Sequence, residues 1–192
     1  MAIPLSLKSC VVLMALLPAV AAADAWQGDQ HSGALRFTAT QAGAKFQGHF
    51  GEFKVLFDFD AADPAKGVLD VTIATASSDT ADTERDEVLH GRDFFWVEHF
   101  PQATYHAEGF KRDGKAWVAS GQLTLRGVTQ PVTVRFELNP KLKLLGMQGG
   151  AALRRLEFGV GQGDWTDTAW LANPVDVAFD LSLQPGTAAP SP

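Results

Sequence analysis

Five histidines lie beyond residue 30, and their side chains could bind a metal ion or transfer protons. No two of them have the i, i+2 or i, i+4 spacing that makes a local metal site convincing. His90 and His99 could approach each other through a loop, with Glu98 or Asp93 as a further ligand. A zinc site built in this way is one hypothesis; the simpler alternative is that these are exposed loop histidines without a ligand.

Three arginines, Arg85, Arg92 and Arg126, carry the other notable chemistry. A guanidinium group at the mouth of a pocket can bind a phosphate or a carbonyl group through two N–H donors. For Arg85 the alternative is a surface ion pair with the flanking Glu84 or Asp86. The chain contains no G-x-S-x-G elbow, no H-E-x-x-H pair and no phosphate-binding loop with its lysine. The sequence therefore predicts no catalytic residue, no cofactor and no metal.

These side chains are positioned by segments in which apolar and polar residues alternate from Leu35 onward, as in strands with one apolar face. The last run, "VDVAFDLSL", is the most regular, and "RLEFGV" is expected to be a strand as well. Turn signals such as "DPAKG", "KRDGK" and "RGVTQP" separate the runs, and "GVGQGD" predicts a tight turn or bulge. About eight or nine strands in this order indicate an all-β antiparallel sandwich or closed barrel.

One segment, about 79–100, interrupts the alternation. "DTADTERDEVLHG" suits a short helix, with Asp79 or Thr80 as its N-cap and Gly91 as its end. "DFFWVEHFP" follows directly, and we expect Phe94, Phe95 and Phe100 to turn inward and close one end of the barrel. The alternative is that these aromatic residues fill the barrel end as ordinary core.

The ends of the chain have a different composition. Lys8 and the apolar run "CVVLMALLPAVAAA" predict a secretory signal peptide over residues 1–23, with an uncleaved N-terminal anchor as the alternative. Cleavage would remove Cys10, the only cysteine, and would change the formal net charge from −6 to −7. So acidic a chain is a poor candidate for binding nucleic acid or an anionic membrane surface. The domain is expected over residues 24–184, with a disordered tail at 185–192.

Two stretches resemble the signature motifs of the YceI-like family. "SSDTADTERDEVLHGRDFFWVEHFPQATYHA" matches its Thr-x-x-x-x-Arg-Asp-x-x-Leu helix followed by Asp-Phe-Phe and Phe-Pro, and "GQLTLRGVTQPV" matches its second motif. "FGVGQGDWTDT" is similar to the C-terminal element of exported members. The resemblance implies a lipocalin-like, eight-stranded antiparallel barrel that binds a polyisoprenoid, an isoprenoid quinone or a similar long-chain lipid. It implies no catalytic residues, and Trp96, Trp170 and Pro174 depart from the usual pattern.

We therefore predict a periplasmic binding protein, not an enzyme, with no membrane span after signal cleavage and with a homodimer left open. Arg85 and Arg92 are predicted to lie at the head-group end of the ligand. An enzyme or metal-assisted isomerase acting on such a lipid, and a filled structural barrel that binds a protein partner, are the two alternatives. The predicted apolar lining consists of Phe37, Phe57, Phe59, Val71, Ile73, Phe94, Phe95, Phe100, Leu125, Val134, Phe136 and Phe179.

Overall fold

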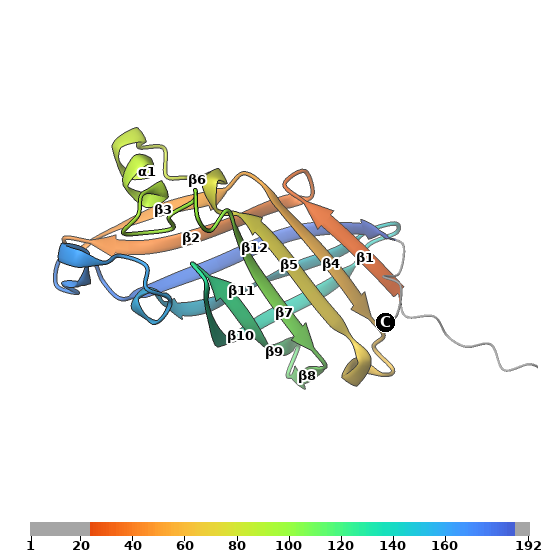
Figure 1. Ribbon diagram of the computed structural model, residues 1–192. Helices are drawn as coiled ribbons and strands as arrows, with labels where there is room; N and C mark the ends of the chain where they lie inside the picture. The colour runs from red at the N-terminus through yellow and green to blue at the C-terminus, as the bar shows by residue number, and fades with distance from the viewer. Residues whose placement is uncertain (1–23, 187–192) are drawn as a thin grey trace, which may run out of the picture.

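The computed structural model describes residues 24–186, so the predicted signal peptide and residues 187–192 of the predicted tail lie outside it. More than half of the described chain is β-strand (Figure 1). The strands are β1 (Asp24–Asp29), β2 (Gly33–Gln41), β3 (Ala44–Phe50), β4 (Phe53–Phe59), β5 (Val68–Ala74), β6 (Ser78–Asp79), β7 (Gln102–Glu108), β8 (Phe110–Asp113), β9 (Ala116–Leu125), β10 (Val128–Pro140), β11 (Leu145–Arg154) and β12 (Pro174–Pro185). The helices are α1 (Thr83–His90) and the 3₁₀ turns η1 (Pro64–Lys66), η2 (Thr75–Ser77), η3 (Arg155–Phe158) and η4 (Gly163–Thr166).

The strands form one closed, eight-stranded antiparallel barrel, as the family resemblance predicts; of the two architectures that the alternation allows, the closed barrel is the one observed. Some of the eight positions around the barrel are occupied by two shorter strands instead of one long strand. β1 and β2 both pair with β12, and at the next position around the barrel β1 pairs with β4 and β2 with β3. The barrel is closed by the pairs Trp26↔Pro185 and Gln27↔Gln184. β12 extends to Pro185, the first residue of the predicted tail.

Alternate side chains point into the barrel. In β4, Phe53, Val55 and Phe57 are buried while Lys54 is exposed, and β7 repeats the pattern with Ala103 and Tyr105. Because successive strand residues face opposite sides of a sheet, the alternating apolar residues of the strands face the interior of the barrel.

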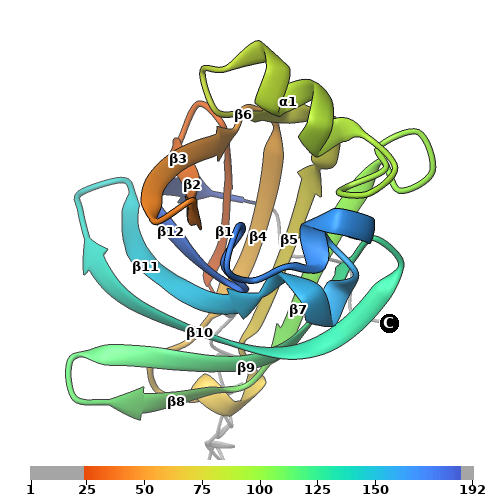
Figure 2. The same cartoon turned by 90° about the vertical axis from the view of Figure 1, so that its left-hand side faces the viewer.

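The break in the alternation between β6 and β7 is where the chain leaves the barrel wall. Helix α1 lies at the rim of one end of the barrel (Figures 1 and 2). Its N-cap is Asp82, whose carboxylate accepts a hydrogen bond from the Arg85 amide, so the prediction of Asp79 or Thr80 was wrong. Gly91 ends the helix as predicted, in an extended conformation. None of the helices within residues 24–186 has the length and apolar character required to cross a membrane.

The segment between β11 and β12 forms a second covering element at the same end. "RLEFGV" was predicted to be a strand, but its first four residues form η3. The chain turns there because Gly159, Gly161 and Gly163 all adopt positive φ, a conformation that is costly for other residues. The Ala42 amide donates to the Trp170 carbonyl, so this segment is tied to the β2–β3 turn.

Candidate functional site: an apolar barrel cavity

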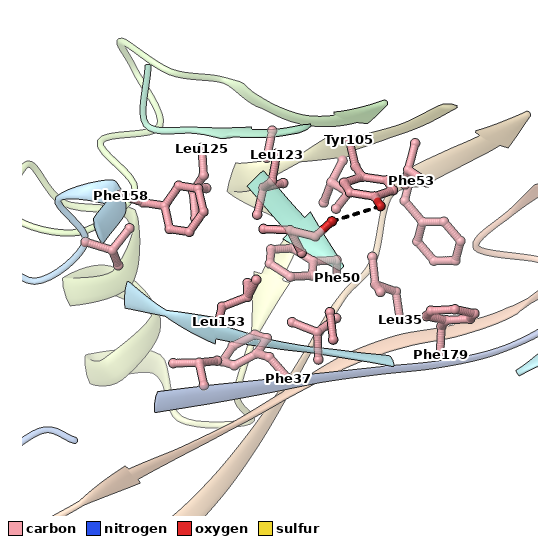
Figure 3. A pocket seen from close by; sticks show the side chains of 18 of the residues that line it. Leu35, Phe37, Phe50, Phe53, Tyr105, Leu123, Leu125, Leu153, Phe158 and Phe179 are labelled. Carbon is pink, nitrogen blue, oxygen red and sulfur yellow. Dashed lines mark hydrogen bonds between the residues drawn. The ribbon is translucent and has the colours of Figure 1, made fainter. Parts of the chain in front are cut away.

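The half of the barrel beneath α1 contains a cavity (Figure 3). The space within it that the centre of a water molecule can occupy is about 200 Å³. All of its lining residues are apolar except Tyr105 and Arg155. Side chains come from both covering elements as well as from the barrel wall, including Leu89 of α1 and Phe158 of η3. The cavity can therefore hold an apolar molecule and offers it very few polar contacts.

The other half of the barrel is filled by five aromatic side chains. Phe57 stacks on Phe59 at 5.3 Å between ring centres, and Phe136 meets the edge of Phe57 at 5.8 Å. Phe110 and Trp117 complete the cluster, at 5.7 Å from Phe136 and 4.9 Å from Phe59 respectively. Phe57 and Phe136 are each only 1% exposed. We call this cluster the aromatic plug; it packs the barrel interior beyond the cavity, and none of its five residues is part of the cavity lining.

The structure divides the predicted lining residues between these two regions. Phe57, Phe59 and Phe136 lie in the plug and not in the cavity lining. Their assignment to the lining was wrong because alternation identifies the inward face of a strand but not the height of a residue along the barrel axis. Phe100 lies outside the cavity lining. The remaining eight line the cavity: Phe37, Val71, Ile73, Phe94, Phe95, Leu125, Val134 and Phe179.

The stretch "DFFWVEHFP" reverses direction at Trp96, which has φ +48°. Phe94 and Phe95 point inward, where Phe94 packs against Trp165 at 5.2 Å and Phe95 against Phe50 at 6.1 Å. Phe100 instead meets the edge of Trp96 at 5.7 Å. Residues 93–101 therefore contribute two side chains to the cavity lining. Trp96, His99 and Phe100 form a separate, smaller aromatic cluster.

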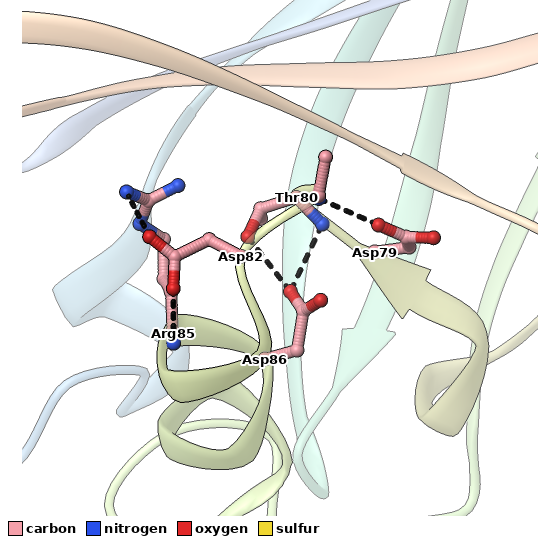
Figure 4. A network of polar contacts seen from close by, with 6 residues as sticks. Asp79, Thr80, Asp82, Arg85 and Asp86 are labelled. Carbon is pink, nitrogen blue, oxygen red and sulfur yellow. Dashed lines mark hydrogen bonds and ion pairs between the residues drawn. The ribbon is translucent and has the colours of Figure 1, made fainter.

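Helix α1 is fastened to the barrel through polar groups (Figure 4). The Asp86 carboxylate accepts hydrogen bonds from both the amide and the hydroxyl of Thr80, at 2.9 and 2.7 Å. Three residues further along the helix, Leu89 faces the cavity. The Thr–Asp–Leu part of the signature motif thus has a physical role: the polar pair fixes the helix start and thereby positions an apolar wall residue.

The three arginines marked in the sequence occupy two places. Arg85 forms an ion pair with Asp82 at 3.0 Å, and its guanidinium lies 4.5 Å from the ring centre of Phe46, a cavity residue. Arg92 and Arg126 lie on the indole of Trp96, at 5.2 and 5.8 Å. Arg85 thus forms an ion pair, although with Asp82 and not with Glu84 or Asp86.

Arg155 was not marked from the sequence, and it is the most buried charged residue in the described chain, with 4% exposure. Its Nη2 donates to the carbonyls of Trp165 and Leu171, both at 2.6 Å. Its other nitrogens donate to three more carbonyl groups, those of Val160, Gly161 and Ala172. Burial lowers the pKa of this guanidinium. The one sequence signal for a buried role of Arg155 is its position just before the glycine-rich segment 159–163, which is expected to turn sharply.

The histidines do not assemble a metal site. Within residues 24–186, no group of three His, Cys, Asp or Glu side chains is placed to hold a metal ion. His90 Nε2 lies 3.0 Å from Ser78 Oγ, whereas His99 stacks on Trp96 at 4.5 Å. On the outer barrel wall, the hydrogen bond to Asp70 raises the pKa of His106.

Comparison with known proteins identifies the fold family. Residues 26–183 match the model of the YceI-like domain. The chain belongs to the YceI-like family. Protein YceI of Escherichia coli O6:H1 is 44% identical over 91 residues, which are 47% of this chain and 48% of that protein. A UPF0312 protein of Photorhabdus laumondii is 42% identical over 91 residues, 47% of each chain. The aligned region thus spans about half the length of these curated relatives.

Solved structures resemble this YceI-like chain over most of its length. The crystal structure of BcnA from Burkholderia cenocepacia has a TM-score of 0.77 and 28% identity, covering 80% of this chain and 98% of BcnA. A polyisoprenoid-binding domain from Saccharophagus degradans, implicated in plant cell wall breakdown, has a TM-score of 0.65 and 13% identity. That match covers 85% of this chain and 99% of the domain, and at this identity it shows a shared fold.

Proposed function

We propose that this YceI-like protein binds one polyisoprenoid chain, or the isoprenoid tail of a quinone, in the cavity beneath α1. The observation that carries the proposal is the lining, in which Tyr105 and Arg155 are the only residues with polar side chains. Both are already engaged by backbone carbonyl groups. The polyisoprenoid-binding domain of Saccharophagus degradans, which shares the fold, supports the same ligand class.

The energetics of such binding depend on chain length. Each methylene group removed from water contributes about 0.8 kcal/mol. A few isoprene units can therefore offset association costs of roughly 4–15 kcal/mol without a polar contact. Selection by length and girth follows, because the aromatic plug limits how deep a chain can enter.

A polar head group would lie near the covering elements. Arg85 beside Phe46 and Arg92 beside Trp96 are the cations that we assign to it, and Arg126 joins Arg92 across the same indole. Two guanidinium groups on one ring favour an anionic group such as a phosphate. We further propose that residues 1–23 export the chain to the periplasm and that it acts by binding, not catalysis.

The test is native mass spectrometry of the protein purified from its own cell envelope, followed by organic extraction of whatever is bound. We expect one polyprenyl or quinone molecule per chain. Phe95→Asp should reduce the occupancy because it places a carboxylate in the apolar wall, whereas Val88→Asp, at an exposed site of α1, should not. A protein that is recovered empty and takes up neither a polyprenyl phosphate nor a quinone would contradict the proposal.

A further inference from the structure

The β8–β9 and β10–β11 hairpins bear a concentration of positive charge on an otherwise acidic protein. Residues 111–115 ("KRDGK") and 141–144 ("KLKL") together carry a net charge of +4, so the rest of the chain carries −10. The one acid among them, Asp113, is paired with Arg135. Within residues 24–186, the other charged residues of these two turns form no ion pair. We call residues 111–115 and 141–144 the basic turns.

The two basic turns border a single groove. It has a volume of about 490 Å³ on the same measure as the cavity. Arg112, Lys115 and Lys141 lie along its sides, with Asp60 as the one acid, and Trp117 and Phe59 of the plug are among its apolar walls. The Arg112 guanidinium lies 4.7 Å from the ring centre of Trp117. Figure 2 shows the two hairpins projecting on the same side of the barrel.

An apolar side chain projects from the same surface. Leu142 is 98% exposed at the tip of the β10–β11 turn, between Lys141 and Lys143, and Leu144 is 37% exposed beside it. A soluble anion would be attracted by the lysines but would make no use of Leu142. The interface of a lipid bilayer meets both features, because it takes up apolar side chains and, when anionic, attracts basic ones.

We propose that the basic turns dock this protein onto the surface of an anionic phospholipid bilayer, with Leu142 inserted among the lipid head groups and acyl chains. The acidic net charge does not prevent this, because screening confines the interaction to charges within about 10 Å of the surface at 0.1 M salt. Helix α1 lies at the other end of the barrel from the β10–β11 turn (Figure 1). The docked protein therefore holds its cavity end away from the bilayer.

The test is co-sedimentation of the mature chain with vesicles of phosphatidylglycerol and phosphatidylcholine, compared with vesicles of phosphatidylcholine alone. We expect binding to the anionic vesicles only, and weaker binding when NaCl is raised from about 0.05 M to about 0.5 M. One basic residue near an anionic surface contributes about 1 kcal/mol, or roughly five-fold in affinity. The double change Lys141→Glu and Lys143→Glu should therefore weaken binding by about 25-fold or more.

Two further variants make the result specific. Lys45→Glu with Lys54→Glu changes the net charge by the same amount at exposed positions of β3 and β4, and should leave most of the binding intact. Leu142→Ser keeps the charge and should weaken binding about ten-fold if the leucine is inserted. All four substituted positions and Leu142 are exposed, so thermal unfolding should confirm that each variant folds.

Several outcomes would overturn the proposal. They are a wild-type protein that ignores anionic vesicles, an equal loss in the Lys45/Lys54 control, and a Leu142→Ser variant that binds normally. Binding that emerged only after deletion of residues 187–192 would assign the groove to the chain's own tail. A dimer that dissociates on Leu142→Asp would assign it to a second copy. None of these results bears on the ligand of the cavity, which extraction tests separately.

Discussion

Phe37 of β2 and Gly48 of β3 are directly opposite each other in the sheet, and the Phe37 ring occupies the space where a Gly48 side chain would lie. The ring thereby rests on the backbone of the neighbouring strand and forms part of the cavity wall. It also packs against Phe50 at 5.5 Å, and Phe50 in turn packs against Phe95 beneath α1. A glycine on one strand thus sets the shape of the cavity through an aromatic residue on the next.

Gly48→Ala should shrink the cavity. The new methyl group would overlap the Phe37 ring and displace it from the backbone of β3, and the ring lines the cavity and packs against Phe50. We expect reduced uptake of a hydrophobic fluorescent dye, with a stability loss of about 1–2 kcal/mol. Gly51→Ala is the matched control, because the nearest atom to its new methyl group is 3.6 Å away. Equal dye uptake by both variants would show that Gly48 does not control the cavity.

Asp86→Ala should loosen the cover of the cavity. The substitution removes the carboxylate that accepts two hydrogen bonds from Thr80 and holds the start of α1 against the barrel. Hydrogen exchange measured by mass spectrometry should become faster in peptides covering residues 80–100, and bound dye should dissociate faster. Glu87→Ala changes the neighbouring exposed carboxylate and should have neither effect. Unchanged exchange in Asp86→Ala would mean that packing alone holds the helix.

Arg155→Met should destabilise the protein strongly. Five carbonyl groups of the segment between β11 and β12 would lose their donor, and several of them are buried. A buried acceptor without a partner costs about 1–3 kcal/mol, so we expect the free energy of unfolding in urea to fall by at least about 3 kcal/mol. Arg154→Met is the control, since Arg154 is 67% exposed and pairs only with Glu157. A loss below about 1 kcal/mol would show that the segment folds without the guanidinium.

The sequence carried enough information for the fold because alternation is a local property of each strand. In "VDVAFDLSL" and in Phe53–Phe59, every second residue is apolar, and these residues face the interior as their spacing requires. The covering elements were harder to predict. The inward turn of Phe94 and Phe95 depends on a positive φ at Trp96, a residue that gives no signal for such a conformation. "RLEFGV" alternates like a strand, but η3 forms because Arg155 binds carbonyl groups 5 to 17 residues away.

The sequence predicts which strand face points into the barrel, but not how far along the barrel axis each residue lies. Phe37 and Phe57 both alternate correctly, yet only Phe37 reaches the cavity, while Phe57 lies in the plug. The two residues lie on strands with different neighbours: β2 pairs with β12 and β3, whereas β4 pairs with β1 and β5. Alternation along a single strand contains no information about that pairing.

The only tyrosine of the chain provides a direct measure of how dry the cavity wall is. Tyr105 lines the cavity, and its hydroxyl donates to the carbonyls of Ala119 and Val132 at 3.2 and 3.1 Å. Burial raises the pKa of this phenol from 10.0 to about 12. Absorbance titration of the folded protein should therefore show tyrosinate forming near pH 12, and urea-unfolded protein should ionise near pH 10.

The same shift makes stability depend on alkaline pH. Between pH 10 and pH 12 the folded protein keeps a proton that the unfolded chain has released, so the free energy of unfolding falls as the pH rises through this window. The contribution is complete below pH 10, and its loss should reach about 2–3 kcal/mol at the upper end. In Tyr105→Phe this dependence should vanish, while lysine and arginine ionisation remains as a shared background. If wild type and Tyr105→Phe lost stability in parallel up to pH 12, the phenol would be in contact with water, and the wall of the cavity would be wetter than its apolar lining requires.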